Sequence, residues 1–287
     1  MDQSEIIELI TKTINSLFTT IFSSIDNNIY SNLDNITFID SKIINNNTFQ
    51  NLLGNNSKTG FLLITDSLLI AFFIFYIIKY YYSNFVDTHT ERPIQFIFKF
   101  IIFGILINSS YFLITQILDL NNLLSTSISQ IGENSVGSPI NFAELIKSLN
   151  KKLYTSYDDF NIFSFEGLIK SFISTGLLNL LFVYSLRFIL IKVFVLITPF
   201  CLLTLISNSS SWIFKSWFKC FFSLLIIQDF IPIILIVIFS IDDSNKILYI
   251  GGIYVLTKIN TYIREIFGGV GLEFNNQMLN LKSFISR

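Results

Sequence analysis

Residues 172–206 read FISTGLLNLLFVYSLRFILIKVFVLITPFCLLTLI, and this stretch decides the class of the fold. Its only charged side chains are Arg187 and Lys192, and an apolar run of about 18 residues or more with so few charges is typical of a helix in a lipid bilayer. At about 1.5 Å per residue, the helix would be about 52 Å long, well beyond the ~30 Å hydrocarbon core of a membrane. We expect one long helix that projects from the membrane and bends near Pro199. A span followed by a half-membrane segment is the alternative.

Four other segments have the same character, namely residues 61–82, 94–118, 221–239 and, more weakly, 247–263. The whole chain is 52% hydrophobic and only 14% charged, whereas a soluble domain carries about 25% charged residues. The sequence therefore predicts an all-α fold, a polytopic membrane protein with about five transmembrane helices. Residues 61–118 would hold the first two of these helices, and residues 168–267 the other three.

The N-terminal region, residues 1–60, differs from the spans because it combines an apolar stripe with polar side chains. Between residues 5 and 33, isoleucines and other apolar residues recur at intervals of three and four, the spacing of one helix face. We expect an amphipathic helix there, packed on a partner or a second copy, or lying on the membrane surface. Residues 34–60 are polar and Asn-rich, which indicates a linker.

Two further polar regions separate or follow the predicted spans. Residues 119–167 are expected to form an extramembrane loop in which 141–153 could be a surface helix, and residues 268–287 form a tail. Lys and Arg gather in the segments that face the cytoplasm. With five spans and the N-terminus outside, that side receives 11 of the 19 basic residues. The sequence therefore predicts a bacterial cytoplasmic membrane protein with its N-terminus outside and its C-terminus inside. The 11 residues are Lys79, Arg92, Lys99, Arg187, Lys192, Lys215, Lys219, Lys258, Arg264, Lys282 and Arg287.

Few residues of the chain are suited to catalysis or to cofactor binding. His89 is the only histidine, and Cys201 and Cys220 are the only cysteines, so neither a zinc site nor a hydrolase triad is indicated. The net charge of −1 gives no field that would attract nucleic acid. We expect no catalytic residue, no cofactor and no metal, and hence no enzyme.

Charged residues inside the predicted spans are the best functional candidates, because each costs about 2.5–3.5 kcal/mol at a helix centre. Lys192 and Asp229 are expected at similar depths in two consecutive helices, where they could form an ion pair. A structural pair, or a Lys192 that reaches the surface, is the alternative to a role in a translocation path. Other candidates at or near the membrane interfaces are Asp66, Lys99, Arg187, Pro199, Trp212 and Trp217.

One local pattern resembles a known family. Residues 192–200 read KVFVLITPF, and Trp212 and the FKSW stretch of residues 214–217 follow. In order and local sequence the chain resembles the TrbL-type polytopic subunit of type IV secretion and conjugation systems, in which a proline ends the long helix and a Trp-containing connection follows. Pro199 and Trp217 occupy those positions here.

The resemblance implies a subunit of a channel in the cytoplasmic membrane. Such a subunit helps to move DNA or protein across the membrane, together with separate ATPases. Five spans with few polar positions enclose little water by themselves, so we also expect a homo-oligomer. The expected partners are the lipid bilayer, further copies, other secretion-system subunits and the transported DNA or protein. A transporter of small solutes or ions and a membrane scaffold or immunity protein are the alternative functions.

Overall fold

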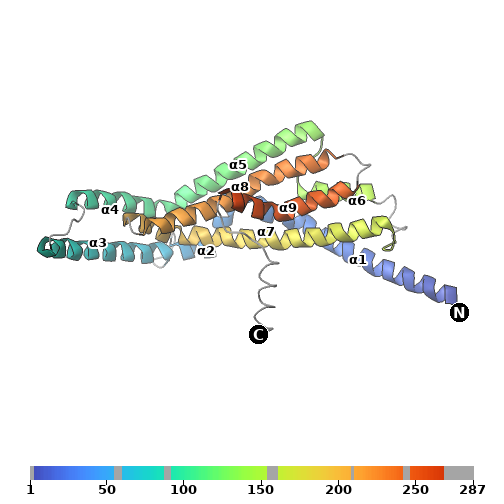
Figure 1. Ribbon diagram of the computed structural model, residues 1–287, viewed down its shortest axis with the longest axis horizontal. Helices are drawn as coiled ribbons and strands as arrows, with labels where there is room; N and C mark the ends of the chain where they lie inside the picture. Colours follow the sequence, from blue (N-terminus) through green and yellow to red (C-terminus); the bar gives the residue numbers. More distant parts are fainter. Residues whose placement is uncertain are drawn as a thin grey trace. The chain divides into compact units, whose positions relative to one another are not determined.

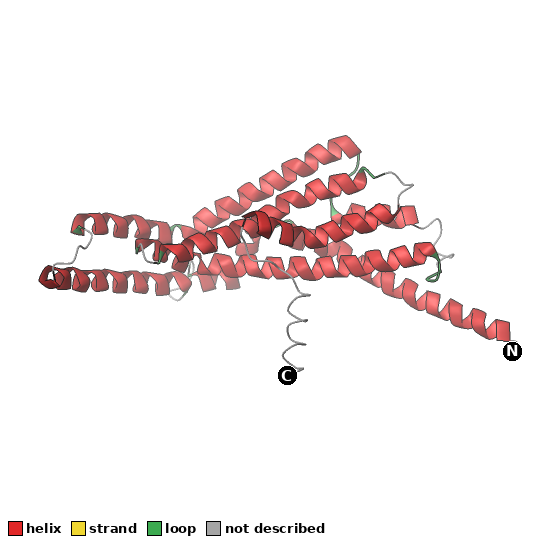
Figure 2. Ribbon diagram, in the orientation of Figure 1, coloured by secondary structure: helices red, strands yellow, loops and turns green. Residues whose placement is uncertain are grey.

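The computed structural model describes residues 3–54, 60–86, 92–153, 161–207, 210–241 and 246–267. Every regular element in these ranges is a helix (Figures 1 and 2), which confirms the all-α class. The elements are α1 (Gln3–Thr37), η1 (Ser41–Ile44), α2 (Asn47–Leu53), α3 (Phe61–Val86), α4 (Pro93–Asn108), α5 (Ser110–Val136), α6 (Phe142–Leu153), α7 (Phe165–Leu203), η3 (Thr204–Ile206), α8 (Ser211–Phe239) and α9 (Lys246–Phe267).

Three helical segments in the described ranges are long and apolar enough to cross a membrane: Phe61–Ser83, Phe165–Ile206 and Ser211–Phe239. A fourth span results if α4 and α5 are one broken helix, since the pair is bent by 57°. Polar side chains lie at the bend. Asn108 Nδ2 donates to the Gly104 carbonyl at 3.1 Å, and Ser109 Oγ donates to the Ile105 carbonyl at 2.9 Å. Side chains that bond to nearby carbonyls compete with the helical ladder.

The long apolar stretch forms one continuous α-helix, α7, of 39 residues. It begins at Phe165, before the expected start at Phe172, and continues through Pro199 to Leu203, where η3 follows. Proline removes one backbone hydrogen bond, but apolar surroundings favour keeping all the others. The α-helix therefore ends four residues after the expected bend.

Two polar regions contain more helix than their composition suggested. In the expected loop 119–167, α5 runs on to Val136 and α6 covers Phe142–Leu153, close to the predicted surface helix. Likewise α8 begins at Ser211, well before the predicted start of that span at Phe221. The predicted tail, 268–287, lies outside the described residues.

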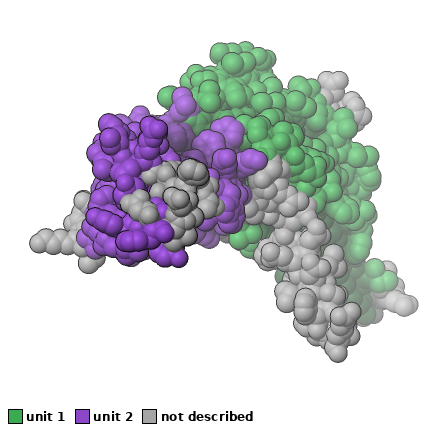
Figure 3. Space-filling model, turned by 60° about the vertical axis from the view of Figure 1, so that its left-hand side comes forward, with its two compact units in different colours: residues 1–39, 121–188, 224–287 green, residues 40–120, 189–223 purple. Residues whose placement is uncertain are grey.

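The chain divides into two compact units (Figure 3). Unit 1 comprises residues 1–39, 121–188 and 224–287, and unit 2 comprises residues 40–120 and 189–223. In unit 2, α3 and α4 pack through stacked aromatic rings, and the ring centroids of Tyr76 and Phe96 are 3.5 Å apart. In unit 1, α6, α7, α8 and α9 and the end of α1 share one hydrophobic core, with Leu33, Phe142, Leu145, Leu177, Leu180, Ile231, Leu235 and Leu256 fully buried.

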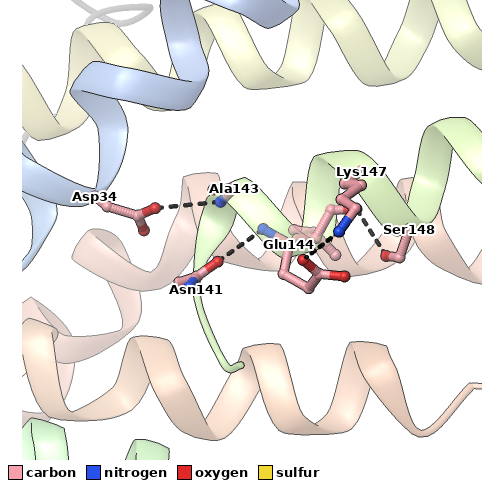
Figure 4. Close-up of polar contacts among 7 residues, drawn as sticks. Asp34, Asn141, Ala143, Glu144, Lys147 and Ser148 are labelled. Atoms are coloured by element: carbon pink, nitrogen blue, oxygen red, sulfur yellow. Dashed lines mark hydrogen bonds and ion pairs between the residues drawn. The ribbon is translucent and has the colours of Figure 1, made fainter. Parts of the chain in front are cut away.

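The docking of α6 on α1 explains why a polar region adopts a defined structure. Asp34 on α1 accepts hydrogen bonds from the backbone N–H groups of Phe142 at 2.9 Å and Ala143 at 3.2 Å. Asn141 caps the same helix by accepting from the Glu144 N–H at 2.7 Å (Figure 4). These acceptors satisfy N–H groups that the first turn of a helix leaves without partners. Burial nevertheless dominates over the two hydrogen bonds and raises the pKa of the Asp34 carboxyl.

Candidate functional site

Arg187, near the middle of the long helix α7, is completely buried in unit 1. Its guanidinium is held mainly by carbonyl oxygens: Nε donates to the Leu224 carbonyl at 2.7 Å and Nη1 to the Thr37 carbonyl at 2.8 Å. Nη2 lies 3.5 Å from Gln228 Oε1, at the limit of a hydrogen bond. A cation in an apolar interior is stable only when such partners replace its water shell.

Gln228 on α8 is also fully buried and holds the backbone of Ile39 at both of its polar groups. Its Oε1 accepts from the Ile39 N–H at 2.9 Å, and its Nε2 donates to the Ile39 carbonyl at 3.1 Å. The same Nε2 also donates to Ser125 Oγ on α5 at 3.1 Å. Arg187 and Gln228 thus provide hydrogen-bond partners just where α1 ends and its last carbonyls lack partners within the helix.

Asp229 adds a negative charge next to this arrangement. Its carboxylate and the guanidinium of Arg187 interact electrostatically. Its Oδ1 atom is buried and has no hydrogen-bond partner in the described part of the chain. The two opposite charges therefore balance each other without a direct hydrogen bond.

Asn260 on α9 is buried, its amide has no hydrogen-bond partner in the described part of the chain, and contacts with two neighbouring helices indicate its level. The hydroxyl of Tyr184 on α7 donates to the Leu256 carbonyl at 3.2 Å. Asn260 follows Leu256 by about one turn, and Gly176 of α7 packs against Ile253 of α9. Asn260 is therefore about level with Tyr184, roughly one turn from Arg187 along the helices.

The contact of α9 with α8 gives the same register. Gly252 of α9 packs against Ile238 of α8. Because α8 and α9 are consecutive and antiparallel, eight residues along each helix bring Asn260 opposite Phe230, the neighbour of Asp229.

These residues form a polar layer across the apolar core of unit 1, which we call the Arg187 layer. Four helices and the end of a fifth contribute to it. It joins a fixed positive charge, a carboxylate and two amide side chains, which is suited to binding water, protons or small polar groups. Among the described residues no three His, Cys, Asp or Glu side chains are grouped to hold a metal ion. The layer consists of Thr37, Ile39, Ser125, Tyr184, Arg187, Gln228, Asp229 and Asn260.

Two of the candidate residues predicted from the sequence, Arg187 and Asp229, lie together in the Arg187 layer. Lys192 belongs to unit 2, whereas Asp229 belongs to unit 1, and the pairing of these two residues stays a prediction. The structure gives Asp229 a different charged neighbour, Arg187, which precedes Lys192 on the same helix.

The remaining candidates lie in unit 2. Asp66 accepts from Asn108 Nδ2 at 3.2 Å, Lys99 is on α4, and Pro199 lies within α7. The two tryptophans differ, because Trp212 is 64% exposed and Trp217 only 7%. Trp217 Nε1 donates to the Phe194 carbonyl at 3.2 Å, and its ring stacks on Phe221.

Sequence reasoning missed Gln228 and Asn260, because neither is charged and amides are common in this Asn-rich chain. One available signal was position: Gln228 adjoins Asp229, and both interrupt the apolar run of residues 221–239. No protein-family model, no curated protein and no solved structure matches this chain. The candidate site is therefore assigned only from the contacts and the burial of its residues.

Proposed function

We propose that the chain is a subunit of a type IV secretion or conjugative channel in a bacterial cytoplasmic membrane, where it helps to move DNA or protein. It would have five spans, with α9 as the fifth, an amphipathic outer segment in α1, its N-terminus outside and its C-terminus inside. Further copies of the chain and separate ATPases would complete the machine. We propose no catalytic role for the chain.

The observation that carries this proposal is the long helix α7 with its buried polar layer. At 39 residues, α7 is about 58 Å long, almost twice the ~30 Å thickness of the hydrocarbon core. Part of it therefore extends beyond the lipid, where it can reach other subunits. The sequence resemblance at residues 192–200 and 212–217 supports the same function.

The exposed apolar surface supports a membrane location for the subunit. Only 11% of the most apolar stretch of α3 is buried inside the described part of the chain. Large side chains such as Phe75, Ile78 and Phe98 lie outside the core. Surfaces of this kind need lipid or other protein to cover them.

The test is deletion of the gene, followed by an assay of DNA transfer and of protein secretion, with the wild-type gene returned as the control. We expect transfer or secretion to be lost and then restored on complementation. Unchanged transfer and secretion would reject the proposal. Unchanged transfer with altered uptake of a solute would favour the alternative of a small-solute transporter, for which the Arg187 layer is the supporting observation.

A further inference from the structure

The N-terminal half of α1 exposes an apolar stripe. Residues 5–10 are exposed on every side of the helix. Further along, Asn15 accepts a hydrogen bond from the Ile162 N–H at 3.0 Å and Phe22 is buried, so this face of α1 is turned toward its own chain. The stripe lies about a third of a turn away from that face. We call it the α1 seam, and it consists of Ile7, Ile10, Leu17 and Ile21, which are 49–60% exposed, and of the half-buried Ile14.

The spacing of the α1 seam is that of a coiled coil. Its five residues follow one another at alternating intervals of three and four, like the a and d positions of a heptad repeat. Isoleucine occupies every a position, and isoleucine or leucine occupies every d position. Such side chains pack as knobs into the holes of a second helix with the same repeat. The seam is therefore shaped for another helix that carries the same pattern.

The positions that flank the seam carry no charge. Three of them are threonines, Thr11, Thr13 and Thr20, whose hydroxyls donate to carbonyls of the preceding turn at 2.8–2.9 Å. Their polar groups are thus satisfied within α1 and need no further partner. The other two flanking residues, Ile6 and Phe18, are apolar. A neutral surface therefore borders the seam on both sides.

The charged residues of this part of α1 favour a protein cover over a lipid one. A helix that lies on a membrane carries Lys and Arg on its polar face, whereas residues 5–25 contain Glu5, Glu8 and only one basic residue, Lys12. In the heptad these three occupy the outer positions b and f, away from the seam. Two copies of the seam can therefore meet without like-charge repulsion, while an anionic lipid surface offers little attraction.

From this pattern we infer that the α1 seam binds the same seam of further copies, so that the N-terminal halves of α1 form a parallel coiled coil in a homo-oligomer. Copies in one membrane share one orientation, and their α1 helices then run parallel around a symmetry axis. Charged flanking residues, which direct a coiled coil to a different partner, are missing here. The inference rests on the several copies of the proposed function, but the contact is measured without a transport assay.

Cysteine cross-linking of the full chain in its membrane tests the contact. Ile10→Cys and Leu17→Cys place a thiol at the d positions, where identical residues of a parallel pair face each other. Leu9→Cys is the matched control, because Leu9 is 60% exposed but lies outside the seam. The unaltered chain is the blank for Cys201 and Cys220. On oxidation we expect several-fold more disulfide-linked dimer at residues 10 and 17 than at residue 9. Equal yields at the three positions, or no dimer above the blank, would overturn the inference.

The mass of the purified chain in detergent gives an independent test. Leu17→Glu puts like charges into the seam and should shift the chain from oligomer to monomer, whereas Leu9→Glu should keep the wild-type mass. Both residues are exposed in the single chain, so both variants should keep the wild-type helix content in circular dichroism. An unchanged mass in Leu17→Glu contradicts the contact.

A lipid cover has its own signature in this experiment. A monomeric wild type, in which a fluorophore at residue 17 is quenched by brominated lipid, would overturn the inference in favour of the membrane surface. Neither result bears on the gene-deletion assay, so the contact between copies and the proposed function can fail separately.

Discussion

Arg187 has the most demanding environment of any residue in the described chain, because a permanent cation there is completely buried. Its hydrogen bonds to the carbonyls of Thr37 and Leu224 serve both partners. They replace the water around the guanidinium, and they satisfy a carbonyl at the end of α1, where positive charge is favoured by the helix dipole. The residue is therefore a point at which α1, α7 and α8 depend on one another.

Replacing Arg187 by methionine should therefore destabilise the folded chain strongly. Arg187→Met leaves the Thr37 carbonyl without its donor and Asp229 without its positive neighbour, which should lower the free energy of unfolding by about 3–5 kcal/mol. The measurement is denaturant unfolding in detergent micelles. Arg92→Met serves as the matched control, since Arg92 is exposed and should change stability by less than about 0.5 kcal/mol. Equal effects of the two substitutions would contradict the role of Arg187.

Double-mutant cycles can decide whether Asp229 is coupled energetically to Arg187 or to Lys192. In the structure Asp229 directly follows Gln228, whose Oε1 atom lies 3.5 Å from Nη2 of Arg187, whereas the sequence suggested Lys192. We expect a coupling energy of about 1 kcal/mol or more between Asp229→Asn and Arg187→Gln. For Asp229→Asn and Lys192→Gln we expect less than half of that value. Stronger coupling to Lys192, again measured by unfolding in micelles, would restore the sequence-based pair.

The sequence could indicate charged candidates but not their surroundings. Arg187 and Asp229 are conspicuous because charge is rare in an apolar run, and the structure brings both into one layer. Gln228 and Asn260 gave no such signal, since an amide in a membrane helix is less costly than a charge. Their role follows from which helix faces meet, and that depends on contacts between residues such as Ile39 and Gln228 that are 189 positions apart.

At the scale of elements, long apolar runs predicted helices well, whereas the amount of helix in the polar segments was underestimated. The apolar content of α3, α7 and α8 makes a helix the most stable backbone in lipid, because it satisfies its own amide groups. In the polar region 119–167, the helix expected at 141–153 is present as α6, which buries one face with Leu145, Ile146 and Leu149. The composition did not indicate that α5 continues to Val136. The break at Ser109 could not be foreseen, because Asn108 and Ser109 bond to the preceding turn in the same way as polar residues within unbroken helices, such as Thr115 in α5.

The contact between α1 and α6 should depend on pH through Asp34. Because burial raises the pKa of this carboxyl in the folded chain above the unfolded value of 3.8, the folded state favours the protonated form. The associated stability is therefore full below pH 3.8 and is lost as the pH rises through the folded pKa. We expect the melting temperature in detergent to fall over this range in the wild type.

Asp34→Asn is the variant that isolates this effect. It keeps an acceptor oxygen for the N–H groups of Phe142 and Ala143 but cannot ionise, so its melting temperature should vary less over the same pH range. Asp40→Asn is a suitable comparison, since Asp40 lies in unit 2 and caps η1. A pH dependence that is the same in Asp34→Asn and in the wild type would show that other groups cause it.

For the whole molecule, the number of membrane crossings depends on α9. Three segments of the described chain are long and apolar enough to cross a membrane, and a fourth results from the bent pair α4 and α5. The sequence-based count of five also needs Lys246–Phe267, a helix that carries Lys258, Arg264 and Glu265. These charges lie toward its C-terminal end, which five spans would place at the cytoplasmic interface. The N-terminal part of α9 contains apolar core residues of unit 1, including Ile253 and Leu256.

Reporter fusions on both sides of α9 can determine whether it crosses the bilayer. With five spans and the N-terminus outside, a fusion at Ile241 follows four crossings and lies outside, and a fusion after Arg287 follows five and lies inside. We therefore expect alkaline phosphatase to be active at Ile241 and inactive at Arg287, with the reverse pattern for fluorescent-protein fusions. If α9 lies along the surface, both positions report the same side, and the chain has four spans with both ends outside. A fusion at residue 88, after α3 alone, is the control and should report the cytoplasm in either case, because the positively charged segment that contains Lys79 and Arg92 is retained there.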